Sequence, residues 1–401
     1  MNTRAPLIAS APLAVSLVSG AAAIQMKIIR FMLAFSVAVV CTAPALGAQY
    51  SLIDLGLFNQ THYGYTTPLD INSSGAVAYS IGNNAVIYSA GTTVSLGSLG
   101  GSSSYASGIN DSGVVVGLLS TQRAFSYQNG TITDLGILGN GPMASSGALS
   151  VNNSGQVVGH STTGRLLQGR YVEYHAVQFG PSITDLGTLG GWYSVATSIN
   201  AVGTIAGWST TIAGSGSDSM RPFVYENGIM KNLGTLGGDG WTGTGSASAL
   251  NDSGVVVGNS WLKNSFGHYV QHAFAYTDGK LIDIGTLAPE YFAAGSQALD
   301  INSNGQIVGT SSVAPNSKSH AFLFSDGVMK DLNSLVQIDG WEISSAESIN
   351  DSGQITAIGW FGGEAHAVLL SPVPEPETYA MMLAGLGLVG FAARRRKLAQ
   401  V

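Results

Sequence analysis

The chain has 401 residues, of which 54 are glycine, one is cysteine and only 10% are charged, and its formal net charge is −7. A hydrophobic fraction of 45% excludes a disordered chain, and glycine without a three-residue period excludes collagen. The negative charge argues against a nucleic-acid partner, and the single cysteine excludes a disulfide scaffold and a cysteine-based zinc site.

Residues 1–48 are expected to be an N-terminal extension followed by a signal peptide. A basic segment at Met26–Arg30 precedes an apolar run at residues 31–40 and small residues up to Ala48. This order is typical of a secretory signal, with cleavage near Ala48. Met26 is a possible true start of translation. The alternative is one long apolar anchor from Ala5 onward, which the charges of Met26–Arg30 interrupt.

Residues 49–371 contain seven repeats, each marked by an asparagine followed three residues later by a glycine. The seven asparagines are spaced by 38, 42, 48, 51, 51 and 48 residues, and they are Asn72, Asn110, Asn152, Asn200, Asn251, Asn302 and Asn350. Each repeat predicts four short strands, because apolar residues alternate with small or polar ones and glycine-containing turns separate the runs.

Four strands in 40–50 residues predict one blade of a β-propeller, so the fold class is all-β with seven blades. The segment that begins at Tyr50 has the sequence of a fourth strand with no strands before it. The segment at 365–370 is a third strand with no fourth after it. The N-terminal strand is therefore expected to close the ring. A linear β-solenoid is the alternative, but it does not explain the missing strand.

The third strands of two repeats begin with His-Ala-Phe, at residues 272–274 and 320–322, and two others begin with the variant His-Ala-Val, at residues 175–177 and 366–368. The repeats resemble the HAF repeat of bacterial extracellular proteins. This resemblance implies an exported repeat protein, without a defined activity.

The repeated polar residues are expected to be structural, because an asparagine present in every blade satisfies backbone groups at its turn. Asp300 begins a segment that imitates a calcium loop, but Ser311 stands where the closing glutamate belongs. The histidines of the third strands belong to different blades. No metal site, cofactor or catalytic residue is therefore expected.

The connections between second and third strands, and between successive blades, should share one face of the propeller. These connections vary in length and contain all six tryptophans. Variable loops on a rigid scaffold are typical binding sites. The hypothetical binding face consists of Trp192, Tyr193, Trp208, Trp241, Trp261, Tyr291, Trp341 and Trp360, with Phe292 beside them. The alternative is that these rings pack between blades as loop staples.

Residues 372–401 form a three-part tail. Pro374-Glu375-Pro376 precedes an uncharged segment at 378–393, and Arg394, Arg395 and Arg396 follow it. The segment predicts a single transmembrane helix whose basic end stays cytoplasmic. The tail resembles the PEP-CTERM sorting signal. This resemblance implies processing by an exosortase and delivery to the outer surface, usually in exopolysaccharide-producing bacteria.

Three functions remain open at this point. The favoured one is a non-catalytic binding or matrix module whose ligand is an exopolysaccharide or a surface protein. The alternatives are a propeller enzyme that acts on extracellular glycans and a purely structural matrix protein. The precursor is expected to be membrane-anchored, and the processed protein is expected at the cell surface or outside the cell.

Overall fold

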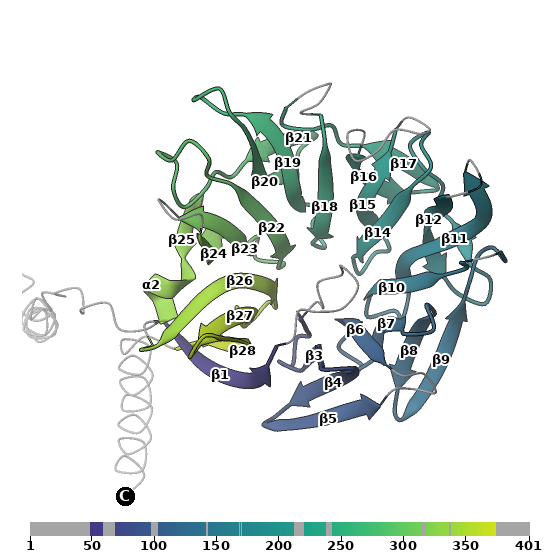
Figure 1. Cartoon of the computed structure of the whole chain (residues 1–401), viewed down its shortest axis with the longest axis horizontal. Helices are drawn as coiled ribbons and strands as arrows, with labels where there is room; N and C mark the ends of the chain where they lie inside the picture. Colours follow the sequence, from purple (N-terminus) through teal and green to yellow (C-terminus); the bar gives the residue numbers. More distant parts are fainter. Residues whose placement is uncertain are drawn as a thin grey trace, which may run out of the picture. The chain divides into compact units, whose positions relative to one another are not determined.

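The structure is a computed structural model in which seven four-stranded antiparallel sheets are arranged in a ring (Figure 1). It describes residues 49–58, 69–97, 103–141, 143–167, 169, 171–211, 220–237, 243–313, 318–336 and 338–373. The first strand of each blade lies nearest the ring axis and the fourth lies outside (Figure 1). The predicted all-β, seven-bladed propeller is confirmed.

Six blades are each built from four consecutive strands. Blade 1 contains β2 (Asp70–Ile71), β3 (Val77–Ile81), β4 (Asn84–Ser89) and β5 (Thr92–Gly97). Blade 2 contains β6 (Ser104–Ile109), β7 (Val115–Leu119), β8 (Ala124–Gln128) and β9 (Thr131–Gly136). Blade 3 contains β10 (Ser146–Val151), β11 (Val157–Leu167), β12 (Tyr171–Phe179) and β13 (Thr184–Asp185).

The second half of the ring repeats this plan. Blade 4 contains β14 (Ser194–Ile199), β15 (Ile205–Thr210), β16 (Met220–Glu226) and β17 (Ile229–Asn232). Blade 5 contains β18 (Gly245–Leu250), β19 (Val256–Lys263), β20 (Tyr269–Thr277) and β21 (Lys280–Asp283). Blade 6 contains β22 (Ser296–Ile301), β23 (Ile307–Val313), β24 (Lys318–Ser325) and β25 (Val328–Asp331), and the short helix α2 (Leu332–Val336) follows it.

The seventh, closing blade joins the two ends of the repeat region. It contains β26 (Trp341–Ile349), β27 (Ile355–Phe361) and β28 (Glu364–Pro372), with β1 (Tyr50–Leu57) as the outer strand. β1 pairs with β28 from Tyr50↔Pro372 to Leu57↔His366. The strand that the sequence leaves over at its start thus completes the blade that lacks a fourth strand.

The core of a typical blade depends on a glycine opposite a phenylalanine. Gly258 on β19 pairs with Phe274 on β20, and Phe274 is fully buried. The inner strand β18 carries a bulge between Ala247 and Ala249, and the carbonyl of Ser246 then lies against Gly258. The glycine of the Val-Val-Gly sequence and the phenylalanine of the Ala-Phe sequence therefore pack against each other. The same arrangement recurs at Gly117, Gly207 and Gly309.

Substitution Gly258→Ala should lower the free energy of unfolding by about 3 kcal/mol, because forcing an extra methyl group into a packed core shifts backbone. The new Cβ would meet the Ser246 carbonyl oxygen and lie 2.9 Å from Ala247 Cα. Gly180→Ala is the matched control, since its Cβ would make only an ordinary contact at 3.4 Å. Urea unfolding of both variants measures the difference. Equal stabilities would contradict the packing account.

The seven asparagines form a hydrogen-bonded ring that joins every blade to the next. Each side-chain Nδ2 donates to the backbone carbonyl of the asparagine in the following blade, over 2.9–3.2 Å, and Asn350 donates to Asn72 to complete the circle. In blade 5, Oδ1 of Asn251 accepts from the amides of Ser253 and Val255. These bonds account for the repeated asparagine as a structural residue.

The direction of the strands separates two faces of the ring. The asparagine turns connect first and second strands on one face, so antiparallel pairing places the other long connections on the opposite face. Among the described residues, no helix is long and apolar enough to span a membrane. The predicted transmembrane helix at 378–393 lies outside those residues.

Candidate binding face

The most exposed aromatic group is a patch on the β19–β20 hairpin of blade 5, named here the hairpin patch. Its exposed rings are Trp261, Phe266, Tyr269 and, from the neighbouring loop, Phe292, with relative exposures of 40%, 49%, 59% and 47%. The hairpin extends because β19 and β20 continue pairing as far as Lys263↔Tyr269. Large apolar rings left in solvent on a variable loop mark a surface suited to a ligand.

Asn264 fixes the hairpin patch. Its Oδ1 accepts from the amides of Phe266 and His268, and its Nδ2 donates to the carbonyl of Phe292 over 2.8 Å. The rings of His268 and Phe292 lie 5.0 Å apart, as do those of Tyr291 and Phe292. These contacts hold the β19–β20 hairpin against the loop that carries Phe292. The exposed rings therefore lie on a fixed surface.

A second aromatic group joins blades 3 and 4. Tyr174 on β12 contacts the rings of Tyr193 at 4.7 Å and Trp208 at 6.2 Å. His160 lies 6.1 Å from Tyr174, and burial lowers the pKa of His160 to about 4, so its imidazole is neutral at neutral pH. Trp208 and Tyr193 are half-buried. These two residues of the predicted binding face therefore pack between blades 3 and 4.

The third aromatic group belongs to the closing blade. Trp341 stacks on Phe361 with ring centres 5.1 Å apart, and its edge meets His366 at 5.3 Å. Trp360 and Phe361 remain 42% and 47% exposed at the tip of the β27–β28 hairpin. This group therefore combines one packed ring with two rings open to solvent.

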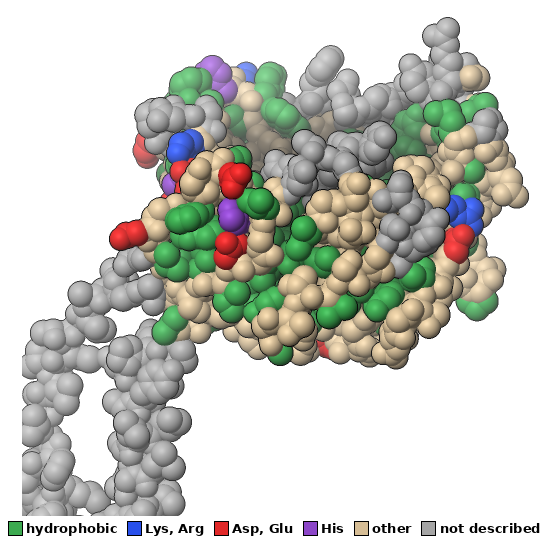
Figure 2. All heavy atoms as spheres, turned by 60° about the horizontal axis from the view of Figure 1, so that its bottom comes forward, with side chains coloured by type: hydrophobic (Ala, Val, Ile, Leu, Met, Phe, Trp, Pro, Cys, Tyr) green, Lys and Arg blue, Asp and Glu red, His purple; other side chains and the backbone are tan. Residues whose placement is uncertain are grey.

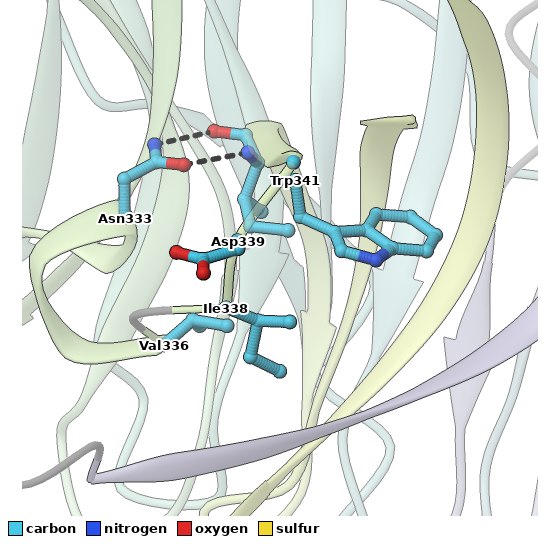
Figure 3. A pocket seen from close by; sticks show the side chains of 7 residues that line it. Asn333, Val336, Ile338, Asp339 and Trp341 are labelled. Carbon is cyan, nitrogen blue, oxygen red and sulfur yellow. Dashed lines mark hydrogen bonds between the residues drawn. The ribbon is translucent and has the colours of Figure 1, made fainter. Parts of the chain in front are cut away.

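A pocket of about 430 Å³ lies beside Trp341 (Figure 3). Asn333, Val336, Ile338, Asp339, Gly340, Trp341 and Ile343 line it. The amide of Asn333 shapes one wall, because it accepts from the backbone N–H of Ile343 and donates to the carbonyl of the same residue. The exposed carboxylate of Asp339 gives the pocket an acceptor for hydroxyl groups.

Charged groups are sparse on the side of the propeller that Figure 2 shows. Hydrophobic side chains there form separate patches among uncharged polar atoms. The segment 49–371 nevertheless has nine basic against 21 acidic residues, so its net charge is −12. This negative net charge disfavours polyanionic ligands.

The histidines of the third strands hold the outer edges of the blades. His175, His272, His320 and His366 contact Asp185, Asp283, Asp331 and Asp54 over 2.7–3.0 Å. In all four of these blades the aspartate also accepts from the backbone N–H two residues later, as Asp283 does from Gly285. In the parts of the chain that the structure covers, no three metal-ligating side chains converge.

The predicted face thus divides into exposed and packed members. Trp261 and Trp360 are exposed, whereas Trp192, Tyr193, Trp208, Tyr291 and Trp341 are half-buried. Trp241 lies outside the described residues, as do all six residues of the sorting signal. The pattern of tryptophans does not predict the exposed rings of Phe266, Tyr269 and Phe361. The length of the β19–β20 and β27–β28 hairpins is the feature that indicates them.

Comparison with protein-family models finds two matches. Residues 372–397 match the model described as PEP-CTERM protein-sorting motif. The chain carries a PEP-CTERM sorting motif. The motif implies an exported protein that an exosortase processes and that is sorted to the cell surface or the extracellular space. Residues 190–368 match the model described as Protein of unknown function (DUF3466). The resemblance to HAF repeats stays a prediction.

The other two comparisons add no functional assignment. A search of curated proteins gives no match. Among solved structures, one titled "Crystal Structure of Mitotic Checkpoint Complex" is similar, with 12% identity over 94% of this chain and 100% of that chain. Its TM-score is 0.39, so it supports no argument about ligands.

Proposed function

We propose that this exported propeller is a non-catalytic module that binds exopolysaccharide through its aromatic face. The observation that carries the proposal is the exposure of Trp261, Trp360 and Phe361 on the face opposite the asparagine ring. An aromatic ring offers a flat apolar surface, and the C–H faces of a pyranose ring match it. The sorting motif supports the proposal, because it delivers the protein to the compartment where such polymers lie.

The pocket beside Trp341 adds a place for a single sugar unit or chain end. Its volume of about 430 Å³ falls within the roughly 300–1,000 Å³ of small-ligand pockets. The Asp339 carboxylate can accept from sugar hydroxyls, while the nearby exposed rings of Trp360 and Phe361 extend the contact surface. A polymer could therefore meet several weak sites on one face, which raises avidity.

Catalysis is not part of the proposal. The two acidic side chains that meet near the ring axis, Asp70 and Asp300, accept hydrogen bonds from backbone amides of their own and neighbouring blades. Carboxylates engaged in this way support the blades.

Replacement of exposed rings should weaken glycan binding. Trp261→Ala and Trp360→Ala are each expected to lower affinity about tenfold, or about 1.4 kcal/mol, because truncation removes a stacking surface. Binding of the folded variants to a glycan array and to purified exopolysaccharide measures the effect. Val202→Ala is the matched control, because Val202 is 78% exposed in an asparagine turn on the opposite face.

The outcomes of this experiment separate the three functions. Loss of binding in the tryptophan variants but not in the Val202 variant supports the aromatic face. Equal binding by all variants contradicts it. Absence of binding by the unmodified protein favours a purely structural matrix protein, and release of shortened glycans favours the enzyme.

A further inference from the structure

Two aspartates occupy the same repeat position, two residues before the ring asparagine. Across the seven repeats this position holds Asp70, Gly108, Ser150, Ser198, Ala249, Asp300 and Ser348. Ring closure places the closing blade between blades 6 and 1. The carboxyls of Asp300 and Asp70 consequently meet on either side of Ser348.

One hydroxyl connects the two carboxyl groups. Oγ of Ser348 lies 2.7 Å from Oδ2 of Asp300 and 3.0 Å from Oδ1 of Asp70. A serine hydroxyl has one proton to donate, so it can satisfy only one ionised carboxylate. Both short contacts are hydrogen bonds when one carboxyl is protonated, because that carboxyl then donates to Oγ while Ser348 donates to the other.

Backbone amides donate to all four carboxyl oxygens, including the two that contact Ser348. Asp300 accepts from the N–H groups of Ile301 and Ile349, and Asp70 accepts from those of Ile71 and Ile109. Asp300 thereby reaches the closing blade, and Asp70 reaches blade 2. The serine bridge lies beside the bond from Asn350 to Asn72 that completes the asparagine ring. The acid pair is thus part of the seam where the propeller closes.

Among the described residues, the inner strands offer no positive charge to stabilise two carboxylates. The inner strands β2, β6, β10, β14, β18, β22 and β26 carry no Lys, Arg or His. On the described strands that contact β22 or β26, His272 is paired with Asp283, and Lys263 at the end of β19 lies over the ring of Tyr269. Lys318 on β24 is paired with Glu342, and His320 with Asp331. Glu347 on β26 is the other nearby acid, and burial raises its pKa.

Burial and mutual repulsion act in the same direction on the pair. Burial raises the pKa of Asp300 to about 7, with the charge of Asp70 adding to it, although the serine and amide bonds oppose the shift. Burial also raises the pKa of Asp70. Such a pair titrates as a unit that retains one proton to higher pH than a lone carboxyl.

We propose that Asp70 and Asp300 share one proton through Ser348 and that this protonated bridge strengthens closure of the propeller in mildly acidic surroundings. In the unfolded chain both carboxyls ionise near their ordinary pKa of about 4. The folded protein therefore binds the additional proton between about pH 4 and about pH 7. The stability contributed by the bridge is complete below that window and is lost as pH rises through it.

The test compares the propeller with its Asp300→Ser variant, since serine stands at this position in blades 3 and 4. Raising the pH from about 5 to about 8 should lower the Tm of the unmodified protein by several degrees more than that of the variant. Ser198→Ala is the control at the same position of blade 4 and should follow the unmodified protein. Parallel Tm profiles for all three proteins would overturn the proposal.

A second measurement does not need the Asp300 variant. Infrared difference spectra of the folded Glu347→Gln propeller, which lacks the other buried acid of β26, should show one protonated carboxyl that disappears as pH is raised through about 7. Loss of every protonated carboxyl band below about pH 5 would overturn the shared proton, even if the Asp300 variant failed to fold.

Discussion

A propeller that lacks residues 49–57 is expected to lose cooperative folding. The deletion removes β1, which pairs with β28 along its whole length. It also removes the buried side chains of Tyr50 and Leu55, and Phe58 loses the strand that leads to it. Each buried large side chain contributes about 1.5–3 kcal/mol, so their loss approaches the roughly 5–15 kcal/mol of a whole domain.

Circular dichroism and thermal melting of the mature chain with and without these residues measure the effect. The shortened protein should melt broadly or aggregate, because the exposed edge of β28 is a template for pairing with other chains. Addition of a peptide of residues 49–58 should restore a sharp transition. A shortened protein with an unchanged Tm would show that closure by β1 is not needed.

The second large effect is expected at the asparagine ring. Asn251→Ala should lower the free energy of unfolding by about 3–5 kcal/mol, because it leaves buried partners without hydrogen bonds. Oδ1 of Asn251 accepts from two turn amides, and Nδ2 donates to the carbonyl of Asn302 in the next blade over 3.1 Å. Asn251 is only 6% exposed, so water cannot replace these bonds.

Asn251→Asp separates the turn from the link between blades. Aspartate keeps the acceptor for the turn amides but has no donor for the Asn302 carbonyl, so an intermediate loss is expected. Asp252→Ala, at the neighbouring exposed position, removes one bond to the amide of Ala201 and should cost less than about 1 kcal/mol. Chemical unfolding measures the stabilities of the three variants. Equal stabilities would contradict a structural role for the asparagine ring.

The repeat architecture could be predicted because each blade carries the same local sequence signals. Alternating apolar residues predicted the strands, and the asparagine-to-glycine spacing predicted the turns. The leftover strand at Tyr50 predicted closure. These signals are local, or they need only a count of strands, so no knowledge of side-chain contacts was required.

Contacts between blades could not be predicted in the same way. The sequence showed that asparagine belongs to a turn, but the circular chain of Nδ2 bonds exists only once seven blades meet. A pair such as His272 with Asp283 could not be predicted, because it depends on the register between the third and fourth strands. The bridge from Asp70 through Ser348 to Asp300 joins residues far apart in the chain, and only ring closure brings them together.

Exposure of the aromatic residues also depended on neighbours. Trp208 and Trp360 both follow the glycine of a second strand, yet their environments differ. Trp208 meets Tyr174 of the preceding blade, whereas Trp360 is 42% exposed at a hairpin tip. The pattern of tryptophans therefore predicts the face of the propeller that carries the rings. The side chains of adjacent blades determine which of these rings are exposed.

Hydrogen–deuterium exchange of the mature propeller with and without exopolysaccharide tests the binding account most directly. The proposal predicts slower exchange in the segments at 261–269, 290–293, 338–343 and 359–364, which carry the exposed rings and the pocket. The seven asparagine turns on the opposite face should exchange at the same rate with and without polymer. Protection confined to those turns, or no protection in any segment, would contradict a glycan-binding aromatic face.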